Sequence, residues 1–231
     1  MEFFKSYGPL AFPWSSLALT QTKFLPILQM IDLTGSEGVS FWVILVNIII
    51  YFFLYRIKLN YKEYGVLLVL VIMPIFYGLY KIDQLSELVW EKREISIIQP
   101  NIDPNLKWES SYRNKLYEDM DSLNALAYNL NPDLVLWPEA ALPNYMRVSY
   151  LRNKYEKLAL NTSIPLLMGT LDYKTLNDER VSLNGSIFFD GSNHNSMYYK
   201  LFLVPFAEYI PLSSKLPFLK KLNFGQGNFY P

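Results

Sequence analysis

The hydrophobic positions are concentrated in the first third of the chain, where two long runs contain no charged residue. The first run extends from Val39 to Tyr55 and the second from Tyr64 to Tyr80, and each is seventeen residues long. That length is the lower limit for an α-helix that crosses the hydrocarbon core of a bilayer. The pattern therefore predicts two antiparallel membrane-spanning helices.

The alternative for these runs is a pair of buried core helices in a soluble protein, because their length is marginal and Asn47 interrupts the first. The connector, residues 56–63, carries the basic residues Arg56, Lys58 and Lys62, whereas the segment before the first run is acidic. Aromatic ends and a basic connector favour a membrane hairpin. By the positive-inside rule the connector is cytoplasmic and the rest of the chain lies on the opposite side.

The segments on either side of these runs complete the expected organisation. Residues 1–38 combine glycine and proline with aromatic residues and lack the apolar core of a secretory signal peptide. They predict a periplasmic or interfacial loop segment. Residues 39–80 hold the two spans, residues 81–93 form a linker, and residues 94–231 form a domain with a different pattern.

In this last domain, short β-rich runs alternate with helical stretches. The expected strands are 95–99, 134–137, 165–169 and 186–189, and the expected helices are 108–130 and 150–160. Such an alternation predicts an α/β domain, in which catalytic groups usually lie at strand ends or in the loops that follow them.

Composition excludes several classes of function. The 21 basic residues equal the 21 acidic residues in number, so no excess of positive charge favours a nucleic-acid partner. The chain contains no cysteine and a single histidine, His194, which excludes disulfides, thiolate metal sites and multi-histidine sites. We therefore predict no metal and no cofactor.

Glu139 is the first candidate for chemistry. It comes directly after a predicted buried strand and behind Pro138, which stiffens the turn. Such a position predicts a partly desolvated carboxylate with a raised pKa, suited to a general base. The alternative is a glutamate that caps a helix or faces solvent.

Lys200 and Glu208 are the second and third candidates. Lys200 is a lone positive charge in an apolar, strand-like run that continues to Val204, and there it could stabilise an oxyanion. Glu208 lies in a segment bounded by Pro205 and Pro211, and could orient Lys200 or a substrate amine. The alternatives are a surface lysine on an edge strand and a purely structural salt bridge between the two.

Together these motifs resemble those of a known family. Leu-Trp-Pro-Glu at 136–139, Tyr-Lys at 199–200 and Leu-Val-Pro-Phe-Ala-Glu-Tyr-Ile-Pro at 203–211 resemble the nitrilase superfamily, specifically its membrane branch, the apolipoprotein N-acyltransferases. The segments Gln-Pro-Asn-Ile at 99–102, Leu-Lys-Trp at 106–108, and Phe-Pro-Trp at 12–14 with Gln21 also resemble that family. The resemblance covers nearly the whole chain.

The resemblance implies a nitrilase-like α-β-β-α sandwich, incomplete here, after the membrane hairpin. It implies that Glu139 is the general base, Lys200 the oxyanion lysine, Glu208 a further essential carboxylate and Trp108 a substrate-contacting aromatic residue. In that family a cysteine takes an acyl group from a phospholipid and passes it to the diacylglyceryl-cysteine amine of an apolipoprotein. The implied location is the bacterial inner membrane, with the catalytic domain on the periplasmic side.

One departure from the family pattern is chemical. Because the chain lacks cysteine, the resemblance places the nucleophile beyond Pro231 and predicts a fragment that is inactive alone. The resemblance also implies further membrane spans before Met1. Two alternatives remain, namely a membrane-tethered amidase of the same superfamily and a non-catalytic membrane-anchored binding protein. The motif at 203–211 and the two spans favour the transferase.

Overall fold

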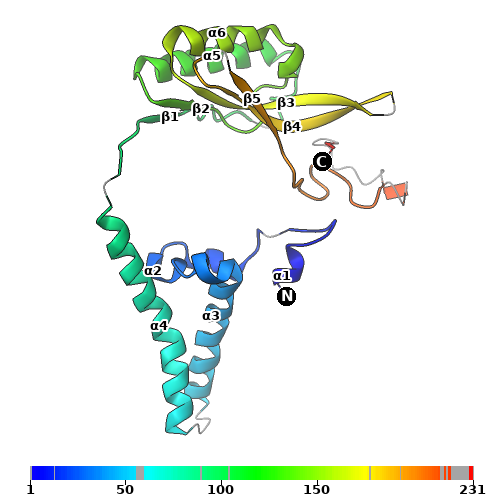
Figure 1. The fold of residues 1–231 in the computed structure, drawn as a ribbon. Helices are drawn as coiled ribbons and strands as arrows, with labels where there is room; N and C mark the ends of the chain where they lie inside the picture. Colours follow the sequence, from blue (N-terminus) through cyan, green and yellow to red (C-terminus); the bar gives the residue numbers. More distant parts are fainter. Residues whose placement is uncertain are drawn as a thin grey trace. The chain divides into compact units, whose positions relative to one another are not determined.

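The chain folds as two compact units, Met1–Trp90 and Glu91–Pro231 (Figure 1). The computed structural model describes residues 2–12, 14–55, 60–88, 90–103, 105–176, 178–192, 194–213, 216, 218–219 and 229–230. Half of the predicted cytoplasmic connector, residues 56–59, lies outside the described residues, and so does most of the stretch after residue 213.

The first unit is helical. Its elements are α1 (Glu2–Lys5), the 3-10 helix η1 (Leu17–Gln21), α2 (Leu25–Leu28), α3 (Ile31–Leu54) and α4 (Tyr61–Ser86). The two long helices α3 and α4 are long and apolar enough to cross a membrane, and only 11% and 6% of their apolar windows are buried. A core helix of a soluble protein would be mostly buried, so this exposure fits the predicted membrane hairpin.

Both long helices extend beyond the apolar runs, although α3 is kinked at Gly35, whose backbone is not helical (φ 68°, ψ −177°), and polar side chains link their outer ends. The helix α3 begins at Ile31, and α4 continues to Ser86. Asp32 at the start of α3 accepts a 2.8 Å hydrogen bond from the hydroxyl group of Tyr77 and pairs with Lys81 at 3.0 Å, both on the last turns of α4. This pairing of opposite ends confirms that the two helices run antiparallel.

The segment before α3 is more ordered than the predicted irregular loop. Helix α2 packs against α4 at Gly78, where an added Cβ would lie 1.7 Å from the carbonyl oxygen of Pro26. Glycine at position 78 therefore permits a backbone contact that any side chain would prevent.

The second unit contains a five-stranded mixed sheet. Its elements are β1 (Ile95–Ile97), α5 (Arg113–Asn129), β2 (Leu134–Leu136), the 3-10 helix η2 (Met146–Val148), α6 (Tyr150–Thr162), β3 (Leu166–Leu176), β4 (Glu179–Phe189) and β5 (Asn195–Tyr199). The strand order is β1-β2-β3-β4-β5, with β1, β2 and β3 parallel and β4 and β5 antiparallel to their neighbours. The unit is α/β, as predicted.

Helices α5 and α6 lie on the same face of this sheet (Figure 1). Each connects two adjacent parallel strands in the same direction across the sheet, and right-handed crossovers then place both helices on one face. The core forms between these helices and the sheet. It includes Leu116, Met120, Val135, Tyr155, Leu166, Met168, Ile187 and Phe189. The described residues contain one sheet, so the predicted sandwich stays a prediction.

Strands β3 and β4 are longer than the sequence predicts. Each has eleven residues, and they pair from Leu166 with Phe189 to Leu176 with Glu179. The predicted runs cover only the apolar, buried ends. The remaining halves mix polar with apolar residues and become more exposed toward the turn, so they carry no continuous hydrophobic signal.

Candidate active site

Glu139 is positioned by the end of β2 and the turn that follows it. The indole of Trp137 is buried and donates a 2.9 Å hydrogen bond to Oδ1 of Asn124 on α5, while its backbone N–H donates to the carbonyl of Leu167 at 2.8 Å. With Trp137 anchored in the core, the chain turns at Pro138 and Glu139 lies outside the core. This places Glu139 at the carboxyl end of a parallel strand, as predicted.

Gly169 on β3 allows this turn to lie against the sheet. A Cβ at position 169 would approach the carbonyl oxygen of Pro138 to 2.4 Å and the Cα of Glu139 to 2.6 Å. Both atoms belong to the backbone, so a side chain here would displace the turn that carries Glu139. Sequence reasoning treated this glycine only as the end of a strand.

Lys200 lies directly after β5, next to the turn that carries Glu139. The prediction that the strand continues through residues 201–204 is wrong, because β5 ends at Tyr199. The backbone N–H of Lys200 still donates a 2.8 Å hydrogen bond to the carbonyl of Asn184 on β4. Its ammonium group lies 3.1 Å from Oε1 of Glu139 and 2.7 Å from Oε1 of Glu208.

Glu208 is held in a tight turn that begins at Val204. Its Oε2 accepts a 2.8 Å hydrogen bond from the backbone N–H of Val204, and its own N–H donates to the carbonyl of Val204 at 2.9 Å. The side chain of Glu208 is 16% exposed, whereas that of Glu139 is 60% exposed. The structure thus brings together the three predicted residues Glu139, Lys200 and Glu208.

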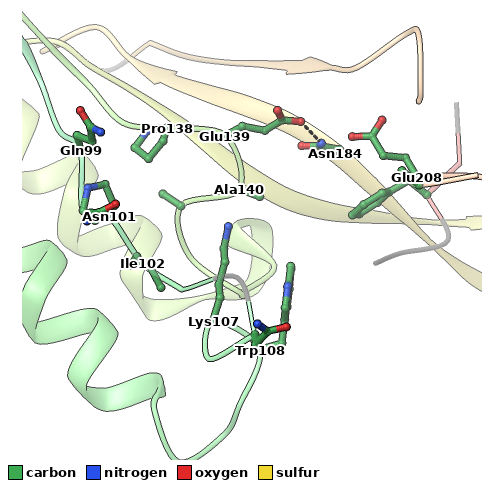
Figure 2. Close-up of a pocket in the computed structure, with 15 residues that line it drawn as sticks. Gln99, Asn101, Ile102, Lys107, Trp108, Pro138, Glu139, Ala140, Asn184 and Glu208 are labelled. Carbon is green, nitrogen blue, oxygen red and sulfur yellow. Dashed lines mark hydrogen bonds between the residues drawn. The ribbon is translucent and has the colours of Figure 1, made fainter. Parts of the chain in front are cut away.

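Asn184 is a fourth member of this cluster, which sequence reasoning missed. It is buried on β4, and its side-chain amide donates a hydrogen bond to Oε1 of Glu139 (Figure 2). No local pattern singled it out, because Ser182 and Ser186 on the same strand are polar as well. Buried amides are usually hydrogen-bonded, so such a residue needs a partner in the fold.

The prediction of a raised pKa for Glu139 is wrong. Burial raises the pKa of Glu139, but the hydrogen bonds from Lys200 and Asn184, with the charges of Lys200 and Lys107, outweigh burial and lower it below the usual value. For Lys200, burial acts in the opposite direction and lowers the pKa. The hydrogen bonds from its ammonium group to Glu208 and Glu139 outweigh burial and raise the pKa overall. Glu139 is therefore an ionised carboxylate near neutral pH, which is the state that accepts a proton.

A cavity of about 750 Å³ opens beside this cluster. Glu139, Asn184 and Glu208 lie on one side of it, and Lys107 and Trp108 come from the loop after β1 on the other (Figure 2). Trp108 is 48% exposed, so it is a wall residue of the cavity and not part of the core. This location fits the predicted contact with a substrate, and the contact itself stays a prediction.

A second charged network adjoins the site through Tyr199, the residue before Lys200. Asp172 on β3 has no exposed surface and accepts hydrogen bonds from Nη2 of Arg147 at 2.7 Å and from the hydroxyl group of Tyr199 at 2.6 Å. Burial raises the pKa of Asp172, but the hydrogen bonds from Arg147 and Tyr199 lower it overall. The network fastens the end of β5 to β3.

The part of the chain that the structure describes contains no group of three or more acidic or histidine side chains able to hold a metal ion. The hydrogen-bonding groups that the structure brings together at the site are the carboxylates, the amide and the ammonium group described above. Together they form a proton acceptor at the wall of an open cavity, with a fixed positive charge beside it.

Comparison with known proteins yields a consistent set of relatives. A family model described as the apolipoprotein N-acyltransferase N-terminal domain matches residues 1–49. The apolipoprotein N-acyltransferase of Geobacter metallireducens is 30% identical, over 100% of this chain and 46% of the relative. That of Chlorobaculum tepidum is 25% identical over 91% and 44%, and that of Borreliella burgdorferi is 29% identical over 91% and 42%.

These comparisons relate both structural units to the same proteins. The match to the Geobacter metallireducens protein extends over both the helical unit and the α/β unit. The chain spans slightly less than half the length of the relatives named above. Along its whole length, the chain is a homologue of the apolipoprotein N-acyltransferases.

Proposed function

We propose that this chain carries the base, the oxyanion lysine and the supporting carboxylate of an N-acyltransferase. The enzyme would move a fatty acyl chain from a phospholipid to the N-terminal diacylglyceryl-cysteine amine of an apolipoprotein. The observation that carries the proposal is the contact of Lys200 with both Glu139 and Glu208, two carboxylates that line a cavity of about 750 Å³. The homology to proteins named for this activity supports it.

The first half of the proposed reaction forms a thioester. Glu139 accepts the proton of a cysteine thiol, and the resulting thiolate attacks the ester carbonyl of the phospholipid. The ammonium group of Lys200 stabilises the negative charge that develops on the carbonyl oxygen. When the carbon–oxygen bond breaks, Glu139 returns the proton to the departing lysophospholipid.

In the second half, the amine of the lipoprotein attacks the thioester. Glu139 takes a proton from the attacking nitrogen and delivers it to the thiolate that leaves, so that the enzyme returns to its starting state. The 231 residues contain no cysteine, so in this scheme the thiol comes from outside them. We expect these residues alone to transfer no acyl chain.

The remaining parts of the chain take roles that follow from this reaction. Both substrates are lipids, and the long helices α3 and α4, whose apolar runs lie within residues 39–80, would keep the catalytic residues of 94–231 at a membrane. Trp108 would contact the substrate from the cavity wall. We place the protein in the bacterial inner membrane with its catalytic domain on the periplasmic side, and we propose that residues 94–231 contribute to a nitrilase-like α-β-β-α sandwich.

A complementation experiment tests this function. The gene would be sequenced on both sides of the 231 codons. The whole reading frame would then be expressed in a bacterium depleted of its own apolipoprotein N-acyltransferase. We expect mass spectrometry of a reporter lipoprotein to show one additional amide-linked acyl chain on its N-terminal cysteine. Substitutions Glu139→Gln and Lys200→Met should abolish it, whereas Glu179→Gln, at an exposed position on β4, should not.

Two outcomes would contradict the proposal. Full N-acylation by the Glu139→Gln variant would exclude Glu139 as the base. An unmodified reporter lipoprotein in cells that express the wild-type frame would exclude the transferase, and hydrolysis of amides by the purified protein would then support the amidase alternative.

A further inference from the structure

Lys107 is a charged residue of the cavity that the proposed reaction does not use. It lies in a tight turn after β1, where the backbone N–H groups of Leu106 and Lys107 both donate 3.1 Å hydrogen bonds to the carbonyl of Asp103. The side chain is half-buried and lines the cavity across from Glu139 and Glu208 (Figure 2). The fixed backbone holds this lysine at the wall.

Among the residues that the structure describes, none forms an ion pair with the ammonium group of Lys107. The two carboxylates of the cavity wall, Glu139 and Glu208, both pair with Lys200, and none of the ion pairs among the described residues includes Lys107. Burial lowers the pKa of Lys107, and the charge of Glu139 opposes this only in part. A partly desolvated cation without a counter-ion is costly, and an anionic ligand would remove that cost.

We propose that Lys107 recognises the phosphate group of the ligand that enters this cavity, which in the intact reaction is the phosphodiester of the phospholipid donor. This inference rests on the proposed function and adds the group that binds the headgroup of the donor. The ester that is attacked and the phosphate are attached to the same glycerol unit. One cavity of about 750 Å³, within the usual size range of ligand pockets, can therefore hold both.

This assignment also separates the two substrates that use the site in turn. The phospholipid donor carries a phosphate, whereas the diacylglyceryl-cysteine acceptor carries an amine and no phosphate. A lysine at the cavity wall attracts the donor and repels an acceptor amine that is protonated. Lys107 therefore favours the neutral amine, which is the nucleophilic form.

A binding measurement tests the inference without requiring catalysis. The 231-residue chain in detergent would be titrated by calorimetry with dihexanoylphosphatidylglycerol, and with dihexanoylglycerol, which lacks the phosphate. We expect the Lys107→Met variant to bind the phospholipid about tenfold or more weakly, because a charge-assisted hydrogen bond is lost. Lys107→Arg should keep most of the affinity, and the affinity for dihexanoylglycerol should not change.

Lys115→Met is the matched control. The ammonium group of Lys115 lies 5.6 Å from the ring centre of Tyr112, the same distance that separates Lys107 from the ring of Trp108. Lys115 is exposed on α5 and is not part of the cavity wall. We therefore expect Lys115→Met to bind the phospholipid as the wild type does.

A second titration with inorganic phosphate distinguishes the source of the phosphate. Tighter binding of the phospholipid than of inorganic phosphate, dependent on Lys107 in both cases, supports the lipid headgroup as the ligand. Binding of inorganic phosphate with no binding of the phospholipid would overturn the assignment to the donor. Equal affinity of the wild type and Lys107→Met for the phospholipid would overturn the role of Lys107 altogether.

Failure of this inference is distinguishable from failure of the proposed function. If the whole reading frame N-acylates lipoproteins and Lys107→Met leaves the KM for the donor unchanged, only the role of Lys107 is wrong. If the frame does not N-acylate but the chain binds phospholipid through Lys107, the phosphate site is correct and the transferase is wrong.

Discussion

The ammonium group of Lys200 lies 2.7 Å from Oε1 of Glu208, and the second carboxylate oxygen of Glu208 accepts a hydrogen bond from the backbone of Val204. Both oxygens of Glu208 are therefore engaged within the protein. This arrangement favours a role for Glu208 in orienting Lys200 over direct binding of a substrate amine, two roles that the sequence left open.

Replacing Glu208 should destabilise the fold as well as the site. Glu208→Ala leaves the Val204 N–H and one side of Lys200 without an acceptor, and we expect a loss of about 1–3 kcal/mol in the free energy of unfolding. Glu208→Gln should cost less, because an amide oxygen still accepts one of these bonds. Urea unfolding followed by tryptophan fluorescence, to which the buried Trp137 contributes, measures both, with the exposed Glu179→Ala as control. Equal midpoints for Glu208→Ala and wild type would contradict this role.

The cluster should make stability depend on pH in both directions. The pKa of Glu139 is lowered, so its contribution is present above the ordinary value of 4.5 and is lost as the pH falls through the folded-state value. The pKa of Lys200 is raised, so its contribution is present below 10.5 and is lost as the pH rises through the folded-state value.

We therefore expect the wild type to exceed Lys200→Met in stability by a constant amount from about pH 6 to pH 9, and by less at both extremes. The share of this difference that belongs to the exposed Glu139 should be below about 1 kcal/mol, because solvent screens it. Urea unfolding of both proteins between about pH 3 and pH 11 gives the difference. A difference that grows in acid would contradict the pairing of Lys200 with the carboxylates.

Gly169→Ala should displace Glu139 while leaving its carboxylate unchanged. The new Cβ would meet backbone atoms of Pro138 and Glu139 at 2.4 and 2.6 Å, and neither can move without the turn. We expect a loss of about 1–3 kcal/mol in stability and loss of N-acylation by the whole reading frame. Gly65→Ala is the control, because nothing lies within 4 Å of its added Cβ. Wild-type activity of Gly169→Ala would show that the position of the turn does not matter.

Replacing Arg147 and replacing Asp172 should lower the free energy of unfolding by different amounts. Arg147→Met leaves the fully buried Asp172 without its counter-ion, whereas Asp172→Asn leaves Arg147, whose side chain is 52% exposed, free to be hydrated. We expect a loss of about 3 kcal/mol for Arg147→Met and a smaller loss for Asp172→Asn. Urea midpoints of the two variants give the order, and the reverse order would contradict the argument.

The pattern along the chain was sufficient to predict two helices long and apolar enough to cross a membrane, the α/β alternation, and that Glu139, Lys200 and Glu208 lie together. Long uncharged runs, short apolar strands and fixed motifs are local features, and each can be recognised within one continuous segment of the sequence. The predicted lengths of β3 and β4 were too short, because the outer halves of these strands mix polar with apolar residues and are partly exposed.

Only the tertiary structure decided the electrostatics of the site. Glu139 meets Lys200 across 61 positions of sequence and Asn184 across 45, and these contacts reverse the pKa shift that burial alone predicts. Lys107 joins the same cavity from the loop after β1. A pKa and a cavity depend on which distant groups come within a few ångströms, and the folding of the sheet and its loops sets those distances.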